Sequence, residues 1–278
     1  MNAFSSEKSP SLRIVSLVPS VTELLCSLGL APYLVGRTGF CIHPFETLRR
    51  VAKVGGTKDV NLAKIAQLRP SHVIVNVDEN TLPTVQALEH MGLRLVVTHP
   101  QSPLDNIHLI DQFATDFIAV HAVSASAAAL KAQIFQALEG FAASSAQPPA
   151  AQRVLYLIWR DPWMTVAQDT YISRMLGLIH WQTWPAVQGG ARGAARYPVV
   201  DMAQAAQAGI ERVLLSSEPF HFDASHLAEL QALLPQAKVQ LVDGEALSWY
   251  GSRCLKGFAL LQQLAQGDAP SPQAHSPE

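Results

Sequence analysis

The sequence predicts an α/β protein of two lobes, each a mostly parallel sheet flanked by helices, joined by one long backbone helix. Three observations support this fold class. Short apolar, β-branched runs alternate with helical patterns in both halves of the chain. The two halves repeat the same pattern at one constant offset, and an alanine-rich stretch without proline, residues 119–147, lies between them.

The first half of the chain predicts alternating strands and helices. Residues 13–18 (RIVSLV) form a short apolar run that ends before Pro19, as expected for a buried strand. Ser20 followed by Glu23 matches a capping box for the next helix, which should end at Gly29. Further strands are expected at 33–36, 72–77 and 94–98, with helices near 61–68, 82–91 and 103–117.

The second half repeats the first. RVLYLI at 153–158 aligns with RIVSLV at 13–18, and the block that begins at Asp201 aligns with the block that begins at Asn61, in both cases 140 residues later. Two segments that share one offset indicate a duplicated topology. Each lobe should therefore present the same strand ends.

The alignment of the two halves indicates an insertion and pairs two acidic residues. Asp78, at the end of a predicted strand, corresponds to Glu218. Eight further residues near DPWMTVAQ at 161–168 separate the first strand and helix of the second half. We expect them to form a hairpin arm that carries Trp163 towards whatever the two lobes face.

The predicted domains follow directly. They are an N-terminal lobe at 13–118, the connecting helix at 119–147, a C-terminal lobe at 152–266 and a tail at 267–278. Apolar residues recur in the helix in steps of three and four, which predicts one buried face. The tail is proline-rich and polar, and we expect it to be disordered.

The amino-acid composition and net charge limit the kinds of partner this protein is expected to have. The 278 residues are 49% hydrophobic, which is enough for a substantial core, and the net charge is −2 with scattered lysines and arginines. Nucleic acid is therefore not an expected partner, and we expect a monomer. Three separated cysteines and an N-terminus that lacks an export signal favour a cytoplasmic location.

The binding candidates follow predicted strands, because ligands of parallel α/β sheets bind at the carboxyl ends of the strands. Two lobes would place those ends on either side of one cleft. Aromatic, cationic and acidic side chains gather there, and they suit a large, flat or chelated ligand. Trp249 in the run SWYGSR is the strongest candidate, whereas Tyr250 equally fits a packing role. The ligand-binding candidates are Arg37, Phe40, Asp78, Glu79, Trp163, Glu218, His221, Trp249, Tyr250 and Arg253. Trp159, Phe220 and Glu245 also follow strands.

The sequence patterns for metal binding and catalysis are weaker than those for ligand binding. His43, in CIH at 41–43, is a candidate axial ligand for a cofactor metal, since one imidazole is enough for that role. No intrinsic cofactor and no catalysis are expected, because the nucleotide, phosphate-loop, nucleophile-elbow and zinc-protease motifs are absent from the sequence. Asp78 and Glu218, on opposite lobes, have two possible roles. They could act as an acid/base pair, or they could mark the rims of the lobes where a partner protein docks. GGARG at 189–193 predicts a flexible connection.

The chain resembles the helical-backbone (class III) solute-binding proteins, the Fe/B12 periplasmic-binding domain family, and is most similar to its vitamin B12-binding branch. The resemblance covers roughly residues 13–265. It is carried by RIVSLVPSVTELLCSLGL, VGGTKDVNLAKIAQLRPSHVIV, the alanine-rich helix and YPVVDMAQAAQAGIERVLL. It implies a two-lobed protein that binds cobalamin, haem or a ferric siderophore in the cleft, with cobalamin as first choice, and delivers it to an ABC transporter permease.

The resemblance also has implications for individual positions. Trp249 matches the second-lobe aromatic that borders a corrinoid, and the loop from Asp78 to Asn80 matches the first-lobe rim. Leu82 stands where the branch has a glutamate for transporter docking, and CIHP replaces a CDYP-like segment. The family implies a periplasmic location. The alternative is a cytosolic enzyme or cofactor-handling protein that uses the same cleft for metal or tetrapyrrole chemistry; a scaffold with a vestigial cleft is a third possibility.

Overall fold

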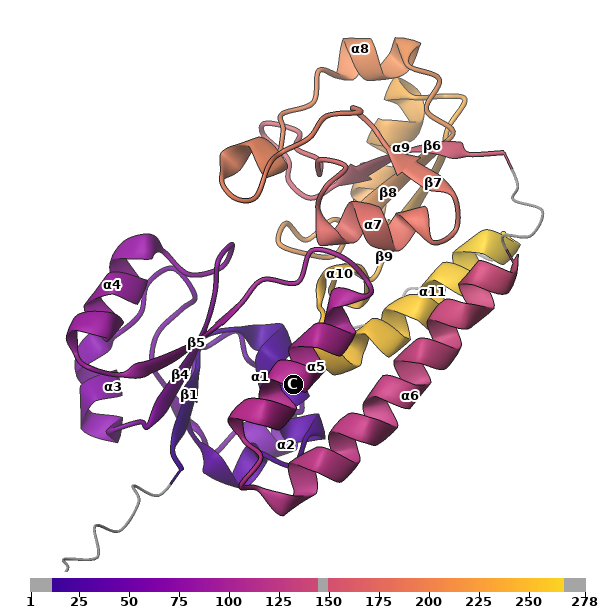
Figure 1. Cartoon of the computed structure of the whole chain (residues 1–278). Coiled ribbons are helices and arrows are strands. Elements are labelled where there is room, and N and C mark those ends of the chain that lie inside the picture. Colours follow the sequence, from indigo (N-terminus) through magenta and orange to yellow (C-terminus); the bar gives the residue numbers. More distant parts are fainter. Residues whose placement is uncertain (1–11, 145–149, 268–278) are drawn as a thin grey trace, which may run out of the picture. The chain divides into compact units, whose positions relative to one another are not determined.

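The computed structural model describes residues 12–144 and 150–267, and the chain divides into two compact units. Unit 1 comprises Met1–His99 with Phe113–Ala127, and unit 2 comprises Pro100–Gln112 with Ala128–Glu278. Each unit contains its own parallel sheet with helices around it, which confirms the predicted fold class (Figure 1). Helices α5 (Asp105–Asp116) and α6 (His121–Ser144) each contribute residues to both units.

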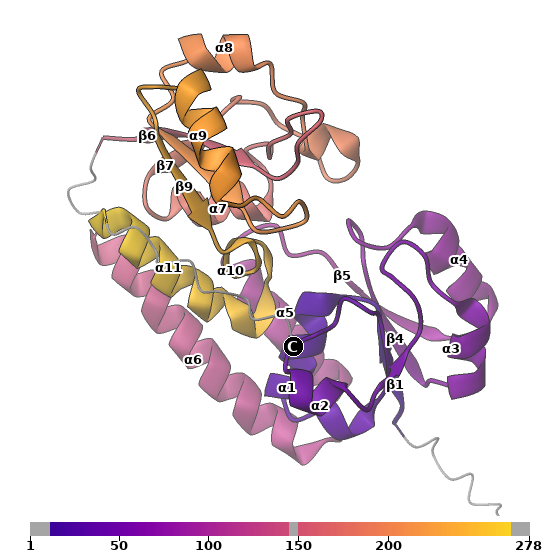
Figure 2. The same cartoon turned by 180° about the vertical axis from the view of Figure 1, so that it is seen from behind.

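Unit 1 is built on a five-stranded parallel sheet in the order β3-β2-β1-β4-β5. Helices α3 and α4 cover one face of it, and α1 lies on the other (Figures 1 and 2). The core between the sheet and α3 and α4 contains Val15, Val73, Ile65 and Leu88. The elements are β1 (Ile14–Ser16), α1 (Pro19–Ser27), β2 (Leu34–Arg37), α2 (Phe45–Leu48), β3 (Ala52–Lys53), α3 (Leu62–Leu68), β4 (His72–Asn76), α4 (Leu82–His90) and β5 (Arg94–Thr98).

Unit 2 is built on a four-stranded parallel sheet in the order β7-β6-β8-β9. Leu155 and Val213 of the sheet pack with Ala205 of α8 and Leu230 of α9 in one hydrophobic core. The elements are β6 (Gln152–Leu157), α7 (Tyr171–Gly177), β7 (Trp181–Thr183), α8 (Met202–Gln207), β8 (Arg212–Ser216), α9 (Ala224–Leu233), β9 (Lys238–Val242), α10 (Gly244–Ser248) and α11 (Cys254–Gln266), with short 3-10 turns at Ala194–Arg196 and Gly251–Arg253. A further 3-10 turn, Ala31–Tyr33, precedes β2 in unit 1.

The structure confirms the duplicated topology. The order β2-β1-β4-β5 of unit 1 recurs as β7-β6-β8-β9 in unit 2, and β8 begins and ends 140 residues after β4. The helix before each of these strands has an equivalent cap. Asn61 accepts a hydrogen bond from the backbone N–H of Lys64, and Asp201 accepts from those of Ala203 and Gln204. Unit 1 has one additional edge strand, β3, and a short helix α2, which the sequence patterns did not predict.

The capping box predicted at Ser20 and Glu23 is wrong. Helix α1 begins at Pro19, its N-cap is Val18, and no side chain caps it. Proline lacks an N–H and has a preset φ, so it fits the first position of a helix. The helix therefore begins two residues earlier than the Ser-x-x-Glu pattern indicates, at Pro19 and not at Val21.

The long helix has the predicted apolar face. Val123, Leu130, Ile134 and Phe141 are buried along it, and within unit 2 the ring of Phe141 meets that of Phe258 in α11 at 5.9 Å. The predicted span 119–147 is longer than the observed helix, and its end at Gln147 and the tail 268–278 lie outside the described residues. Over the described part of the chain, no helix combines the length and apolarity needed to span a membrane.

Candidate functional site

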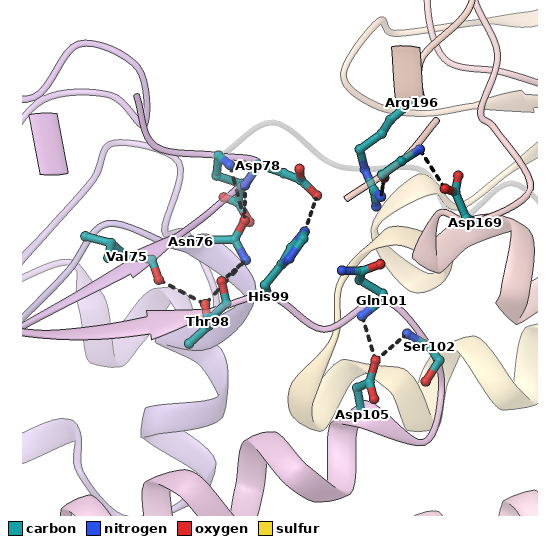
Figure 3. A network of polar contacts seen from close by, with 12 residues as sticks. Val75, Asn76, Asp78, Thr98, His99, Gln101, Ser102, Asp105, Asp169 and Arg196 are labelled. Carbon is teal, nitrogen blue, oxygen red and sulfur yellow. Dashed lines mark hydrogen bonds and ion pairs between the residues drawn. The ribbon is translucent and has the colours of Figure 1, made fainter. Parts of the chain in front are cut away.

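Unit 1 places a polar network at the carboxyl ends of β4 and β5 (Figure 3). The side-chain Oδ1 of Asn76 accepts hydrogen bonds from the backbone N–H groups of Asp78 at 2.8 Å and Glu79 at 3.2 Å, and its Nδ2 donates to the carbonyl of Thr98 at 2.9 Å. The loop after β4 is thus tied to the end of β5. The Oδ2 of Asp78 lies 3.2 Å from Nε2 of His99.

Further hydrogen bonds hold the loop after β4 in place. The buried Asn80 donates from Nδ2 to the carbonyls of Leu17 and Thr57, and Lys58 donates from Nζ to the carbonyl of Asp78 at 2.6 Å. The side chains of Asp78 and Glu79 are half-buried. The ligand-binding candidates Asp78 and Glu79 therefore lie on a hydrogen-bonded loop at the carboxyl end of β4. His99, which directly follows β5, contacts the same loop through Asp78.

The remaining unit 1 candidates lie after β2. Arg37 is buried and donates to the carbonyls of Leu48 and Thr38, both at 3.0 Å, so its guanidinium fastens α2 to the sheet. Phe40, in contrast, is 63% exposed. His43 is half-buried and precedes Pro44 by a cis peptide bond.

The cysteine of the CIH motif is held by two hydroxyl groups. The Cys41 thiol is buried, lies 3.1 Å from the hydroxyls of both Thr22 and Thr38, and its pKa is raised by burial. A raised pKa disfavours the thiolate, which is the form that binds metals. Among the residues the structure describes, no three His, Cys, Asp or Glu side chains are grouped to hold a metal ion.

Unit 2 places a carboxylate at the position that repeats Asp78. Ser216, which aligns with Asn76, donates from Oγ to the carbonyl of Glu218 at 2.6 Å and so fixes the loop after β8. The Oε1 of Glu218 accepts hydrogen bonds from Oγ of Ser248 at 2.6 Å and from Nε1 of Trp249 at 2.9 Å. Burial raises the pKa of Glu218, and the nearby Glu245 carboxylate raises it further.

The SWYGSR run is packed inside unit 2. Trp249 is 8% exposed, and the guanidinium of Arg253 lies 4.7 Å from the centre of its ring. Arg253 also donates from Nη1 to Oε2 of the buried Glu245 at 2.7 Å. Tyr250 is buried and meets Tyr171 edge to face at 5.9 Å. Trp249, Arg253 and Glu218 thus come together, as the sequence suggested, but in an internal cluster.

The predicted hairpin arm forms. The backbone N–H of Ile158 donates to the carbonyl of Met164 at 3.0 Å, and that of Met164 to the carbonyl of Trp159 at 3.1 Å. Trp163 is half-buried, because its ring stacks on Phe222 at 6.1 Å. Trp159, which is 41% exposed, presents more surface than Trp163 at this end of the sheet. The exposed His221 lies in the loop after β8.

The glycine-rich segment is anchored, contrary to the flexible connection predicted for it. The carboxylate of Asp169 accepts hydrogen bonds from the N–H groups of Gly189 at 2.8 Å and Gly190 at 2.7 Å. Burial opposes ionisation of Asp169, but these two bonds and the nearby Arg196 hold its pKa below the ordinary value. Arg196 is buried and donates to the carbonyl of Gly190. Figure 3 labels Arg196 and Asp169.

The raised pKa of Glu218 predicts a pH dependence of stability. Because the folded state binds this proton more readily than the unfolded state, the stabilisation is fully present below the ordinary pKa of 4.5 and is lost as the pH rises through the raised value. Glu218→Gln keeps an Oε1 acceptor for Ser248 and Trp249 but carries no charge. We expect the variant to be more stable than wild type at pH 7. We also expect it not to show the loss of stability with rising pH that Glu218 causes in wild type.

The measurement is urea unfolding between pH 4 and pH 7.5, followed by tryptophan fluorescence. All five tryptophans lie in unit 2, so their emission reports on this unit. Ser248→Ala serves as the opposite control, because it removes a hydrogen bond that lowers the pKa of Glu218, and its stability should fall more steeply with pH. If the stability of Glu218→Gln changes with pH in parallel with that of wild type, Glu218 is not the group responsible for this pH dependence.

The comparisons with known proteins agree with this architecture. No family model matches the chain. A vitamin B12-binding protein of Vibrio vulnificus (strain CMCP6) is 29% identical over 115 residues, which cover 40% of this chain and 42% of that protein. An uncharacterized ABC transporter substrate-binding lipoprotein of Bacillus subtilis (strain 168) is 28% identical over 182 residues, 64% of this chain and 57% of that protein. The chain thus aligns with less than half the length of the first of these relatives.

Two solved structures match almost the whole chain. The periplasmic vitamin B12 binding protein of Vibrio cholerae superimposes with a TM-score of 0.76 at 19% identity and covers 91% of this chain and 97% of its own. A periplasmic heme binding protein from Pseudomonas aeruginosa gives a TM-score of 0.75 at 21% identity, with 92% and 93% covered. All four proteins are named for binding and not for catalysis, which agrees with the expectation that this chain is not an enzyme. The chain therefore has the same α/β fold, with two parallel sheets, as these two solved binding proteins.

Proposed function

We propose that this chain is a substrate-binding protein of the ABC-transporter type whose ligand is a metal-containing macrocycle or chelate. Cobalamin is the first choice, and haem and ferric siderophores are the alternatives. The observation that carries the proposal is the fold match across 91% of this chain to a vitamin B12 binding protein. Sequence relatives named for vitamin B12 binding support the same ligand.

The side chains at the carboxyl end of the unit 1 sheet favour cobalamin within this class. Asp78 and Glu79 follow β4 there, and both are half-buried. Carboxylates at a binding surface repel anionic groups such as the propionates of haem, whereas they accept hydrogen bonds from neutral amides. Cobalamin carries amide side chains around its ring. Phe40 of the same unit is 63% exposed and supplies aromatic contact area for the ring itself.

A direct titration tests the proposal. Purified protein is titrated with cyanocobalamin, haemin and a ferric siderophore while tryptophan emission and visible absorbance are recorded, and equilibrium dialysis gives the stoichiometry. We expect saturable binding of one ligand per chain, with cyanocobalamin bound most tightly. If none of the three compounds binds, the proposed function fails.

His43 is proposed as an axial ligand for the metal of that compound. A change in the Soret or corrin absorbance band on binding should then be lost in His43→Ala. His108→Ala, which removes an exposed imidazole of α5, is the matched control. An unchanged band shift in His43→Ala would remove the axial role and leave the binding proposal standing.

Delivery to a membrane transporter outside the cytoplasm is part of the same proposal. It is supported by the relative from Bacillus subtilis, which is named as an ABC transporter substrate-binding lipoprotein. Leu82, the first residue of α4, is exposed where the resemblance implies a docking glutamate. The test is whether the ligand-loaded protein stimulates ATP hydrolysis by a cobalamin permease in proteoliposomes; no stimulation by loaded protein would contradict delivery.

A further inference from the structure

An apolar row crosses three neighbouring segments of unit 2. Trp159 pairs with Met164 in an antiparallel β-bridge, and Met164 pairs with Val199 in another. Side chains that lie opposite each other across such bridges project to the same side. Trp159, Met164 and Val199 therefore share one face, and we call them the Trp159 row.

The row is unusually exposed for its composition. Trp159 is 41% exposed, Val199 is 61% exposed, and Met164 is half-buried. Apolar surface costs about 25 cal/mol for every Å² left in water, so a ligand that covers the row gains this free energy. Trp159 has no hydrogen bond from its indole N–H to any residue in the described part of the chain.

Other rings hold the row in place. Phe220 meets the edge of Trp159 at 5.7 Å, and its backbone N–H donates to the carbonyl of Ile158 at 3.3 Å. Phe222 lies 4.7 Å from Phe220 and stacks on Trp163. The row is thus supported by a packed aromatic base, so little conformational entropy would be lost when a ligand binds to it.

The position of the row suits a small ligand. The hairpin that carries Trp159 and Met164 follows the carboxyl end of β6, where parallel α/β sheets bind ligands. A stable protein interface needs about 800 Å² from each partner, and three partly exposed side chains supply much less. A flat ring system needs only one aromatic platform with apolar neighbours.

We propose that the Trp159 row binds the face of a tetrapyrrole macrocycle, the chemistry that corrins and porphyrins share. The inference rests on the proposed function and adds to it the residues that contact the ring. Trp159 supplies the stacking surface, and Met164 and Val199 extend it as a soft apolar floor. Trp249, whose ring is already covered by Arg253, does not supply this surface.

The test compares Trp159→Ala, Trp159→Phe and Phe135→Ala with wild type, each titrated with cyanocobalamin and with haemin by equilibrium dialysis. Phe135 is the matched control, because it is 47% exposed in the unit 2 part of α6. We expect Trp159→Ala to weaken binding of the preferred macrocycle by about 10-fold or more. Trp159→Phe should lose less, and Phe135→Ala should bind as wild type does. Val199→Ser, at the most exposed end of the row, should also weaken binding and is the variant least able to disturb folding.

The outcomes separate this inference from the proposed function. If wild type binds a macrocycle and both Trp159→Ala and Val199→Ser bind it equally well, the row is not the ring site, although the function stands. If wild type binds only a ferric siderophore, which has no tetrapyrrole face, the inference is likewise overturned. A wild-type dimer in size-exclusion chromatography that Trp159→Ala dissociates would assign the row to self-association instead. If wild type binds none of the three ligands, the function itself fails.

Discussion

Arg253→Met is expected to destabilise unit 2 by about 3–5 kcal/mol. The guanidinium of Arg253 donates to Glu245 at 2.7 Å, and the two side chains are only 4% and 9% exposed. Removing the cation leaves the carboxylate of Glu245 in a buried environment without its guanidinium partner, which costs far more than the net contribution of the pair. The variant also uncovers one face of Trp249.

Urea unfolding followed by tryptophan emission measures this effect in unit 2 alone. The double variant Glu245→Leu/Arg253→Met removes both charges of the pair and should be more stable than Arg253→Met, because Glu245 is no longer a buried carboxylate that lacks its guanidinium partner. The experiment also separates two roles for Arg253. If Arg253→Met unfolds at the same urea concentration as wild type but loses ligand binding, the guanidinium serves the ligand and the structural role is contradicted.

The topology was predictable because its signals are local. The apolar run at 13–18, the strand at 72–77 and the cap residues Asn61 and Asp201 each specify their own segment. A fixed offset of 140 residues then relates the two sheets without any knowledge of tertiary contacts. The short strand β3 has two residues, too few for a recognisable pattern.

The side chains of the site were less predictable, because their directions depend on distant partners. Trp159 and Trp249 both follow strands, so the sequence places both at the ligand-binding edge. Trp249 turns inward because Glu218, 31 residues away, accepts its indole N–H, whereas Trp159 stays exposed. Arg37 is similar, since its hydrogen bond to Leu48 depends on the unpredicted helix α2. Position along the chain identified the sheet edge, and tertiary packing decided which groups reach its surface.

Gly257→Ala is expected to destabilise unit 2 by about 3 kcal/mol, at the upper end of the range for overpacked sites. A Cβ at this position would lie 2.3 Å from the carbonyl oxygen of Ala246 and 2.7 Å from Cε of Met175. The methionine side chain can move, but a backbone carbonyl of α10 cannot yield without separating α10 from α11. Helix α10 carries Glu245 and Ser248, so its displacement would also disturb the hydrogen bonds of Glu218.

Gly140→Ala is the matched control, because it makes the same change within helix α6 of the same unit. A Cβ at Gly140 would meet nothing within 4 Å, and replacing glycine by alanine in a helix interior stabilises by about 0.5–1 kcal/mol. The two variants should therefore shift the urea midpoint of tryptophan emission in opposite directions. If Gly257→Ala also raised the midpoint, the close contact between α10 and α11 would not exist in solution, and the internal position of Trp249, which follows α10, would have to be abandoned with it.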